Sequence, residues 1–337
     1  MDTTKENFWQ KNRTMIKGII IGILVLILLI PMEFVKNLIY EREARQKEAI
    51  TEVSSKWSGT QNISGPIIVL PYWYEQADTA KKISKIKRFA YLLPDELNIN
   101  STVKPQERSR GIYKVMLYTS INHINGVFKE FPSQLNIDTN KIIWQEAFVR
   151  LDISDTKGLN EELKIKWNNI ELILSPQVLE NSNSNESLTA LLYLSNVNDL
   201  KNINFSSDIT LSGTEQLLFT PLGKKTTVSI NSSWQHPSFT GNILPQTSNI
   251  NKEGFNATWK NMAHNRKFPQ YWKEGSYDLK TAAFGVDFFI PVNGYQKTLR
   301  SVKYAALCIL LTFAAFFLVE TINKKPVHLF HYGLIGL

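Results

Sequence analysis

The feature that most constrains this chain is an uncharged apolar run near its beginning, at residues 18–32. Extended to residues 15–35, with Lys17 and Glu33 near its edges, the run has the length that an α-helix needs to cross a bilayer, about 20 residues. A cleaved signal peptide would require small residues after the apolar core, but residues 31–34 are Pro-Met-Glu-Phe. The run therefore predicts an uncleaved transmembrane helix, and the lipid bilayer is the first expected partner.

A second apolar run, residues 304–319, lies near the other end of the sequence. The short basic turn 323–326 follows it, and a new apolar run then continues to residue 337. Short basic loops between membrane segments usually face the cytoplasm. The turn therefore predicts a cytoplasmic N-terminus and an outer location for the long middle of the chain. The basic residues that flank the first helix are nearly balanced and decide this orientation less well.

These runs divide the sequence into consecutive segments. The apolar stripe that fades after residue 39, together with the i,i+4 pairs Glu41–Arg45 and Glu43–Lys47, predicts that the first helix continues beyond the bilayer. Because residues 327–337 are too short to span, further membrane helices are expected after them. We expect a cytoplasmic N-terminus (1–17), a transmembrane helix (15–35), a helical stalk (36–60), a β-rich periplasmic domain (61–300), a second transmembrane helix (301–322), a cytoplasmic turn (323–326) and the start of a third helix (327–337).

Between residues 66 and 291 the apolar residues recur mainly with a period of two, as in half-buried β-strands. Residues 97–104 and 255–260 show this alternation, whereas residues 67–70 form a continuous apolar run typical of a fully buried strand. Turn-forming residues separate the runs. The pattern predicts a mainly β domain of antiparallel, sandwich-like sheets between flanking transmembrane α-helices. The Asn-Ser tract at 181–185 is expected to be its most mobile loop.

The composition argues against several classes of function. The formal net charge is +8, but the basic residues of the middle are scattered, so no nucleic acid partner is expected. The single cysteine, Cys308, lies in an apolar run, which excludes a disulfide or a thiolate metal site in the middle domain. No Walker loop, Rossmann fingerprint, His-Glu-x-x-His pattern or Gly-x-Ser-x-Gly elbow occurs. We therefore expect no catalytic residue, no cofactor and no metal, and predict that the chain is not an enzyme.

Two polar features lie at the membrane segments. His328 and His331 are three residues apart and could share a helix face, but interfacial hydrogen bonding is commoner there than metal ligation. Glu320 ends the second apolar run, with Lys324 four residues on, and an ion pair at the helix end is the expected arrangement. A carboxylate inside a membrane can carry function. This one is not deep enough in the run to favour that alternative.

Two short segments dense in proline and aromatic residues form a hypothetical partner surface. They are residues 236–239 and 267–272. The alternative is that their aromatic side chains belong to the core or to a sheet surface, as expected for the other tryptophans of the middle domain. The candidate contact residues are His236, Pro237, Phe239, Phe268, Pro269 and Trp272.

Stretches spread along the chain carry a family resemblance. They are Ser64-Gly65-Pro66 followed by IIVLPY, and residues 91–95, 107–113, 236–239, 255–260, 268–272 and 302–320. In these stretches the chain resembles the CreD family of bacterial inner-membrane proteins, which belong to the Cre regulon and are associated with envelope integrity. The resemblance implies one N-terminal helix, a large periplasmic domain and a group of C-terminal helices. It also implies a link to stress signalling through a sensor-kinase pair, the β-lactam response and colicin tolerance, with no agreed enzymatic activity.

Three functional hypotheses follow. The leading one is a protein of the envelope stress response or envelope integrity that acts through protein or envelope contacts of its periplasmic domain. The second is a transporter or a permease-like membrane protein, for which Gly- or Pro-broken helices would be evidence. The third is a periplasmic ligand-sensing domain, which a deep apolar pocket with convergent polar groups would favour.

Overall fold

The computed structural model describes residues 13–77, 83–176, 187–288, 290, 294–323 and 327–336. The chain divides into two compact units. Ala49–Pro291 form the β unit, and Met1–Glu48 together with Val292–Leu337 form the helical unit. The Asn-Ser tract at 181–185 and the basic residues 324–326 lie outside the described residues.

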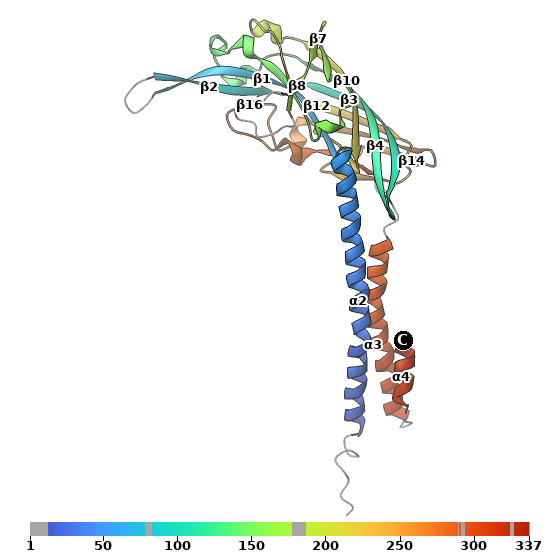
Figure 1. Ribbon diagram of the computed structural model, residues 1–337. Helices are drawn as coiled ribbons and strands as arrows, with labels where there is room; N and C mark the ends of the chain where they lie inside the picture. Colours follow the sequence, from blue (N-terminus) through green and yellow to red (C-terminus); the bar gives the residue numbers. More distant parts are fainter. Residues whose placement is uncertain are drawn as a thin grey trace, which may run out of the picture. The chain divides into compact units, whose positions relative to one another are not determined.

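The helical unit contains the two apolar runs (Figure 1). Helix α2 (Arg13–Lys56) begins with the first run and continues through the segment expected to be a stalk, so that its last turns belong to the β unit. Helices α3 (Gly294–Asn323) and α4 (Leu329–Gly336) complete the unit. Among the described residues, Met15–Lys56 and Lys297–Asn323 are long and apolar enough to cross a membrane. The predicted flanking helices are therefore confirmed as candidate membrane spans.

The β unit is built from two sheets, which confirms the mainly β class. In the described residues the first, sheet A, has nine strands and the second, sheet B, has eight. Sheet A contains β13 (Pro237–Gly241), β17 (Phe284–Phe288), β11 (Gln216–Phe219), β1 (Gln61–Ala77), β5 (Phe148–Ile153), β9 (Ser187–Leu191) and β8 (Ser175–Pro176) in that order, with β2 (Ile83–Leu92) beside β1 and β16 (Tyr271–Lys273) beside β2. Sheet B has the order β14 (Thr247–Asn251), β15 (Gly254–Met262), β12 (Lys225–Ser232), β3 (Glu96–Arg110), β4 (Tyr113–Phe128), β10 (Ile203–Thr214), β6 (Lys164–Trp167) and β7 (Ile170–Ile173).

Short 3-10 helices connect some of these strands. They are η1 (Ser133–Leu135), η2 (Thr139–Lys141), η3 (Trp144–Glu146), η4 (Thr156–Gly158), η5 (Val197–Leu200), η6 (Ala263–Asn265) and η7 (Leu279–Ala282).

Pairing within the sheets is more varied than the sequence predicts. Most neighbouring strands are antiparallel, but β1 pairs with β11 in parallel and β12 pairs with β3 in parallel. Both sheets are therefore mixed rather than purely antiparallel. A parallel neighbour cannot be reached by a tight hairpin and requires a long crossover connection. Alternation in a strand reports which face is buried and carries no information about such long-range partners.

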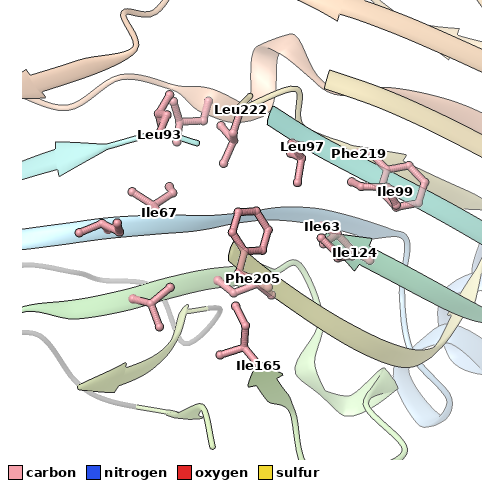
Figure 2. Close-up of a cluster of buried hydrophobic side chains, with 14 of the residues drawn as sticks. Ile63, Ile67, Leu93, Leu97, Ile99, Ile124, Ile165, Phe205, Phe219 and Leu222 are labelled. Carbon is pink, nitrogen blue, oxygen red and sulfur yellow. The ribbon is translucent and has the colours of Figure 1, made fainter. Parts of the chain in front are cut away.

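The core lies between the two sheets, where side chains of both meet in one cluster (Figure 2). Leu97 and Ile99 of β3 are at most 1% exposed, whereas Asn100, which follows Ile99, is exposed. This alternation is the one that a period of two predicts. Phe205 of β10 joins the same cluster. Ile67 and Ile68 of β1 are both fully buried, which confirms that the continuous apolar run is a strand covered on both faces. Each such side chain contributes roughly 1.5–3 kcal/mol when it leaves water.

Candidate functional site

The first proposed contact segment forms the outer edge of sheet A. Residues 237–241 are strand β13, the last strand of the sheet. It pairs with β17, and Pro237 lies opposite Phe288. His236, just before it, is exposed, and Pro237 is half-buried. The His236 carbonyl accepts a hydrogen bond of 2.9 Å from the Trp234 indole, and the two rings meet edge to face at 6.0 Å. These contacts hold the start of β13 in a defined position at the surface.

Phe239 of β13 faces the interior instead. Its ring meets those of Phe255 at 5.9 Å and Trp259 at 5.6 Å, both edge to face. Such aromatic pairs add roughly 0.5–1.5 kcal/mol to the gain from burial. Phe239 therefore fixes β13 to the core, and within this segment His236 and Pro237 supply the outward surface.

The second proposed segment lies mainly in the core. Phe268 is 6% exposed and Trp272 is 8% exposed, so neither side chain offers a surface to a partner; only Pro269 of this segment's three candidates is exposed. Strand β16 pairs with β2, and alternation along β16 turns Trp272 inward. Its ring stacks on Tyr91 at 5.0 Å. The alternative interpretation of these aromatic residues, as core side chains, accounts for Phe268 and Trp272.

Arg266 is a structurally important residue that the sequence analysis did not identify. It is 8% exposed, and its guanidinium donates to the carbonyls of Pro221 (2.9 Å) and Leu222 and to the side-chain oxygen of Gln270. The Gln270 amide in turn donates to the Leu93 carbonyl at 2.9 Å. Burial lowers the pKa of Arg266 to about 10, so the group stays charged at neutral pH. No feature of the sequence separates this arginine from the exposed ones, because its partners are distant backbone carbonyls.

A hollow of about 330 Å³ opens beside this network. The buried apolar residues Ile68, Leu93 and Phe128 line it. The exposed charged residues Glu130 and Lys224 also line it. It combines apolar and polar residues, as a ligand-sensing function requires. The amide of Gln270, a half-buried residue, is already satisfied by protein carbonyls, because it donates to Leu93 at 2.9 Å and to Pro94 at 2.7 Å.

Two half-buried carboxyl groups meet where β11 and β17 begin to pair. Gln216 of β11 lies opposite Asp287 of β17 and donates to its carboxylate at 3.2 Å. Burial raises the pKa of Asp287, and this hydrogen bond offsets part of the increase. Burial also raises the pKa of the adjacent Glu215, and the negative charge of Asp287 raises it further. The pair is therefore a site that favours bound protons in the folded state.

We expect Asp287→Asn to reduce the pH dependence of stability. Because the folded-state pKa of both carboxyls is raised, the folded chain binds more protons than the unfolded chain above their usual pKa, about 4. Their stabilising contribution is complete below that value and is lost as pH rises through the raised pKa. The melting temperature of the full chain at pH 4.5 and at pH 7.5 measures the effect. The variant should gain stability at pH 7.5 relative to the parent, and the exposed-site control Glu253→Gln should not.

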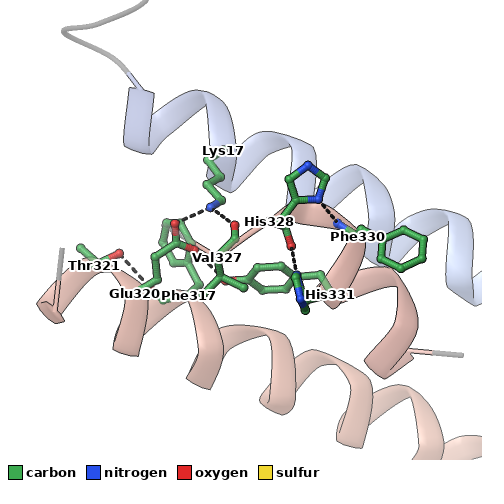
Figure 3. A network of polar contacts seen from close by, with 9 residues as sticks. Lys17, Phe317, Glu320, Thr321, Val327, His328, Phe330 and His331 are labelled. Carbon is green, nitrogen blue, oxygen red and sulfur yellow. Dashed lines mark hydrogen bonds and ion pairs between the residues drawn. The ribbon is translucent and has the colours of Figure 1, made fainter. Parts of the chain in front are cut away.

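In the helical unit, Lys17 and Glu320 form an ion pair between α2 and α3 (Figure 3). Lys17 also donates to the carbonyl of Val327, and the Tyr332 hydroxyl of α4 donates to the other Glu320 oxygen at 3.1 Å. The two charged side chains are only 20% and 12% exposed, respectively. Lys324, the partner expected for Glu320, lies outside the described residues. The sequence alone did not connect Lys17 with Glu320, which are 303 positions apart.

An apolar cluster joins the same three helices as this ion pair. Ile21 of α2, Phe313 of α3 and Tyr332 of α4 are buried against one another, and the Phe313 and Tyr332 rings meet edge to face at 5.5 Å. Charged groups that are shielded from water are stable only when paired. The arrangement therefore fastens α2, α3 and α4 together.

His328, which precedes α4, and His331 of α4 make local hydrogen bonds. The backbone N–H of Phe330 donates to Nδ1 of His328 at 3.2 Å, and the N–H of His331 donates to the His328 carbonyl at 3.0 Å. The two imidazole rings are 6.4 Å apart. In the part of the chain that the structure describes, no three His, Cys, Asp or Glu side chains are grouped as metal ligands.

Comparison with known proteins connects these features to a family. A profile described as inner membrane protein CreD matches residues 13–337. The chain belongs to the CreD family. Inner membrane protein CreD of Escherichia coli (strain K12) is 28% identical over 320 residues, which cover 93% of this chain and 70% of that protein. The resemblance seen in the sequence is confirmed, and with two candidate spans the chain is assigned to the membrane proteins of the envelope.

Some solved structures are distantly similar to this chain. The M1 zinc metallopeptidase from Deinococcus radiodurans is 9% identical, with a TM-score of 0.25, and the match covers 50% of this chain and 38% of that chain. A mutant of that peptidase bound to a Tyr-Ser-Ala substrate gives a TM-score of 0.24 at 10% identity. The chain thus matches well under half the length of these peptidases. These values are too low to support a functional comparison.

Proposed function

We propose that this chain is an inner-membrane protein of envelope integrity or of the envelope stress response. Its β unit acts on the periplasmic side through contacts with another envelope or membrane protein, without catalysing a reaction. Membership in the CreD family supports the inner-membrane location. The two apolar helices supply the anchor, and the β unit supplies a folded surface with its own core.

The observation that carries the contact hypothesis is the free edge of strand β13. In the described part of sheet A, β13 is terminal and has β17 as its strand neighbour. A terminal strand presents unpaired backbone N–H and C=O groups to which an extended segment of another protein can add. Phe239 packs the strand against the core from the inside, and the exposed His236 lies just before its start.

Site-specific photocrosslinking in cells tests this proposal. A photoreactive phenylalanine analogue replaces His236 in one variant and Tyr193, a 73% exposed aromatic residue, in a matched control. We expect a discrete covalent adduct of the full chain from position 236, strengthened under envelope stress, and none from position 193. If position 236 gives no adduct with or without stress, although the protein is inserted in the membrane at its normal level, the contact proposal is wrong.

A further inference from the structure

Polar side chains gather on the outer face of sheet A where β1 and β5 pair. Along β5, Leu151 and Ile153 are fully buried and point inward, so that alternation places their neighbours on the opposite face. Ile63 of β1 is also buried, so the same alternation places its neighbours Asn62 and Ser64 on the opposite face. The polar residues that line this face are Asn62, Ser64, Arg150, Asp152 and Ser154.

A β-bulge brings Ser64 of this group to its position. The register of β1 against β5 shifts between Ser64, which lies opposite Asp152, and Ile67, which lies opposite Arg150. Gly65 within the bulge has a φ of +153°, and a Cβ there would lie 2.9 Å from the Leu151 Cα. Only glycine allows this close approach of the two strands. Bulges commonly redirect a side chain beside a functional site, and here Ser64 lies directly across from Asp152 at the edge of the bulge.

The segment at η7 covers this face and turns it into a pocket. Tyr277, Asp278, Leu279 and Lys280 line a pocket of about 190 Å³ together with the polar residues of β1 and β5. Tyr277 is 44% exposed, and its ring meets that of Trp272 edge to face, with ring centres 5.4 Å apart. The pocket is below the roughly 300–1,000 Å³ of sites for drug-sized molecules, so it fits a single small molecule.

Two buried donors of the pocket residues have no hydrogen-bond partner within the described chain. They are the hydroxyl of Ser64, a residue only 4% exposed, and Nε of Arg150. Another nitrogen of Arg150 donates to Asp152 at 2.9 Å, and the other Asp152 oxygen accepts from Ser187 at 2.7 Å. An unsatisfied buried donor costs roughly 1–3 kcal/mol and calls for an explanation. The larger hollow beside Gln270 differs in this respect, because that amide is satisfied by carbonyls.

The chemistry of the lining selects one class of ligand. The charges of Arg150 and Lys280 balance those of Asp152 and Asp278, which favours a neutral ligand over an ion. The lining contains both hydrogen-bond donors (serine, asparagine and arginine) and acceptors (serine, asparagine and carboxylate). Hydroxyl groups of a ligand can both donate and accept, so they match this mixture. The Tyr277 ring adds a rigid apolar surface on which the C–H face of a sugar ring can pack. We infer that this pocket binds a neutral, polyhydroxylated ring the size of one sugar residue, independently of the contact at β13.

Ligand-detected NMR with the full chain tests this inference. The protein is kept in a zwitterionic detergent, because maltoside or glucoside head groups would compete. We expect saturable, millimolar binding of D-glucose or N-acetylglucosamine and none of succinate. Tyr277→Ala should weaken the affinity roughly five- to tenfold, and Tyr277→Phe, which keeps the ring, should change it less than about twofold. Ser64→Ala should weaken it by a similar factor if the variant keeps its melting temperature.

Three results would overturn the inference. They are no saturable binding of either sugar, preferential binding of succinate, and sugar binding that Tyr277→Ala leaves unchanged. Tyr277 is exposed, so its alanine variant should stay folded and serve as the decisive comparison if Ser64→Ala does not fold.

Discussion

Replacing Arg266 with methionine is expected to lower the free energy of unfolding of the β unit by about 3–5 kcal/mol, since several buried acceptors lose their donor together. The guanidinium holds the carbonyls of Pro221 and Leu222 and the side chain of Gln270, in a position where water does not reach it freely. Methionine keeps much of the side-chain length but removes the guanidinium, whose carbon lies 4.6 Å from the centre of the Phe268 ring. The loss therefore reports the hydrogen bonds of the guanidinium together with its contact with Phe268.

Urea unfolding of the full chain, followed by tryptophan fluorescence, measures this effect. Lys267→Met is the matched control, because it removes the same charge one residue along at an exposed position. It should change stability by less than about 0.5 kcal/mol. Equal stabilities for the Arg266 and Lys267 variants would show that the buried network does not stabilise the fold.

Replacing Glu320 with glutamine is expected to loosen the packing of α2, α3 and α4 by about 2–3 kcal/mol. The change leaves the Lys17 ammonium, only 20% exposed, without its counter-ion. Breaking a buried pair from one side costs roughly 3–5 kcal/mol, and the partial exposure of both groups reduces that cost. Tyr332 also exchanges a carboxylate acceptor for a neutral amide. Backbone hydrogen exchange in α3 and α4 should accelerate by roughly 30- to 150-fold, at 1.36 kcal/mol for each factor of ten.

Glu33 offers a matched control on α2. Its carboxylate is 63% exposed and pairs with Lys36 at 3.0 Å. An exposed ion pair contributes at most about 1 kcal/mol, so Glu33→Gln should barely change the exchange rates. The double variant Lys17→Met, Glu320→Leu should recover part of the lost protection, because it removes both charges at once. Equal exchange in the Glu320 variant and the parent would exclude an important role for this ion pair.

Local patterns in the sequence predicted the elements of the fold well. The uncharged run at residues 18–32 lies within α2, a candidate membrane span. The sequence could predict this span because it is recognised by the length and apolarity of a single segment. The alternation at residues 97–104 and 255–260 became strands β3 and β15. Period-two patterning was informative there because each strand buries one face. The resemblance to the CreD family depended on stretches spread over nearly the whole chain, and the family match confirmed it.

The candidate site was harder to predict, and the reason is physical. Composition suggested that Phe268 and Trp272 lie at a surface, but the pairing of β16 with β2 turns Trp272 into the core. Of the six candidate residues, His236 and Pro269 are exposed and Pro237 is half-buried, and whether a partner binds there stays a prediction. A proline- and aromatic-rich segment has the same composition in a core as on a contact surface.

The sequence by itself determined the apolar helices, the strand-rich middle and the family. Each depends on residue type and on spacing over short distances, through hydrophobic burial and backbone geometry. Only the tertiary structure decided that Lys17 faces Glu320, that Arg266 is buried among backbone carbonyls, and that Ser64 and Arg150 line one pocket. Those arrangements join residues far apart in the chain. Their energies depend on distance and on exclusion of water, and neither quantity is encoded in any local pattern.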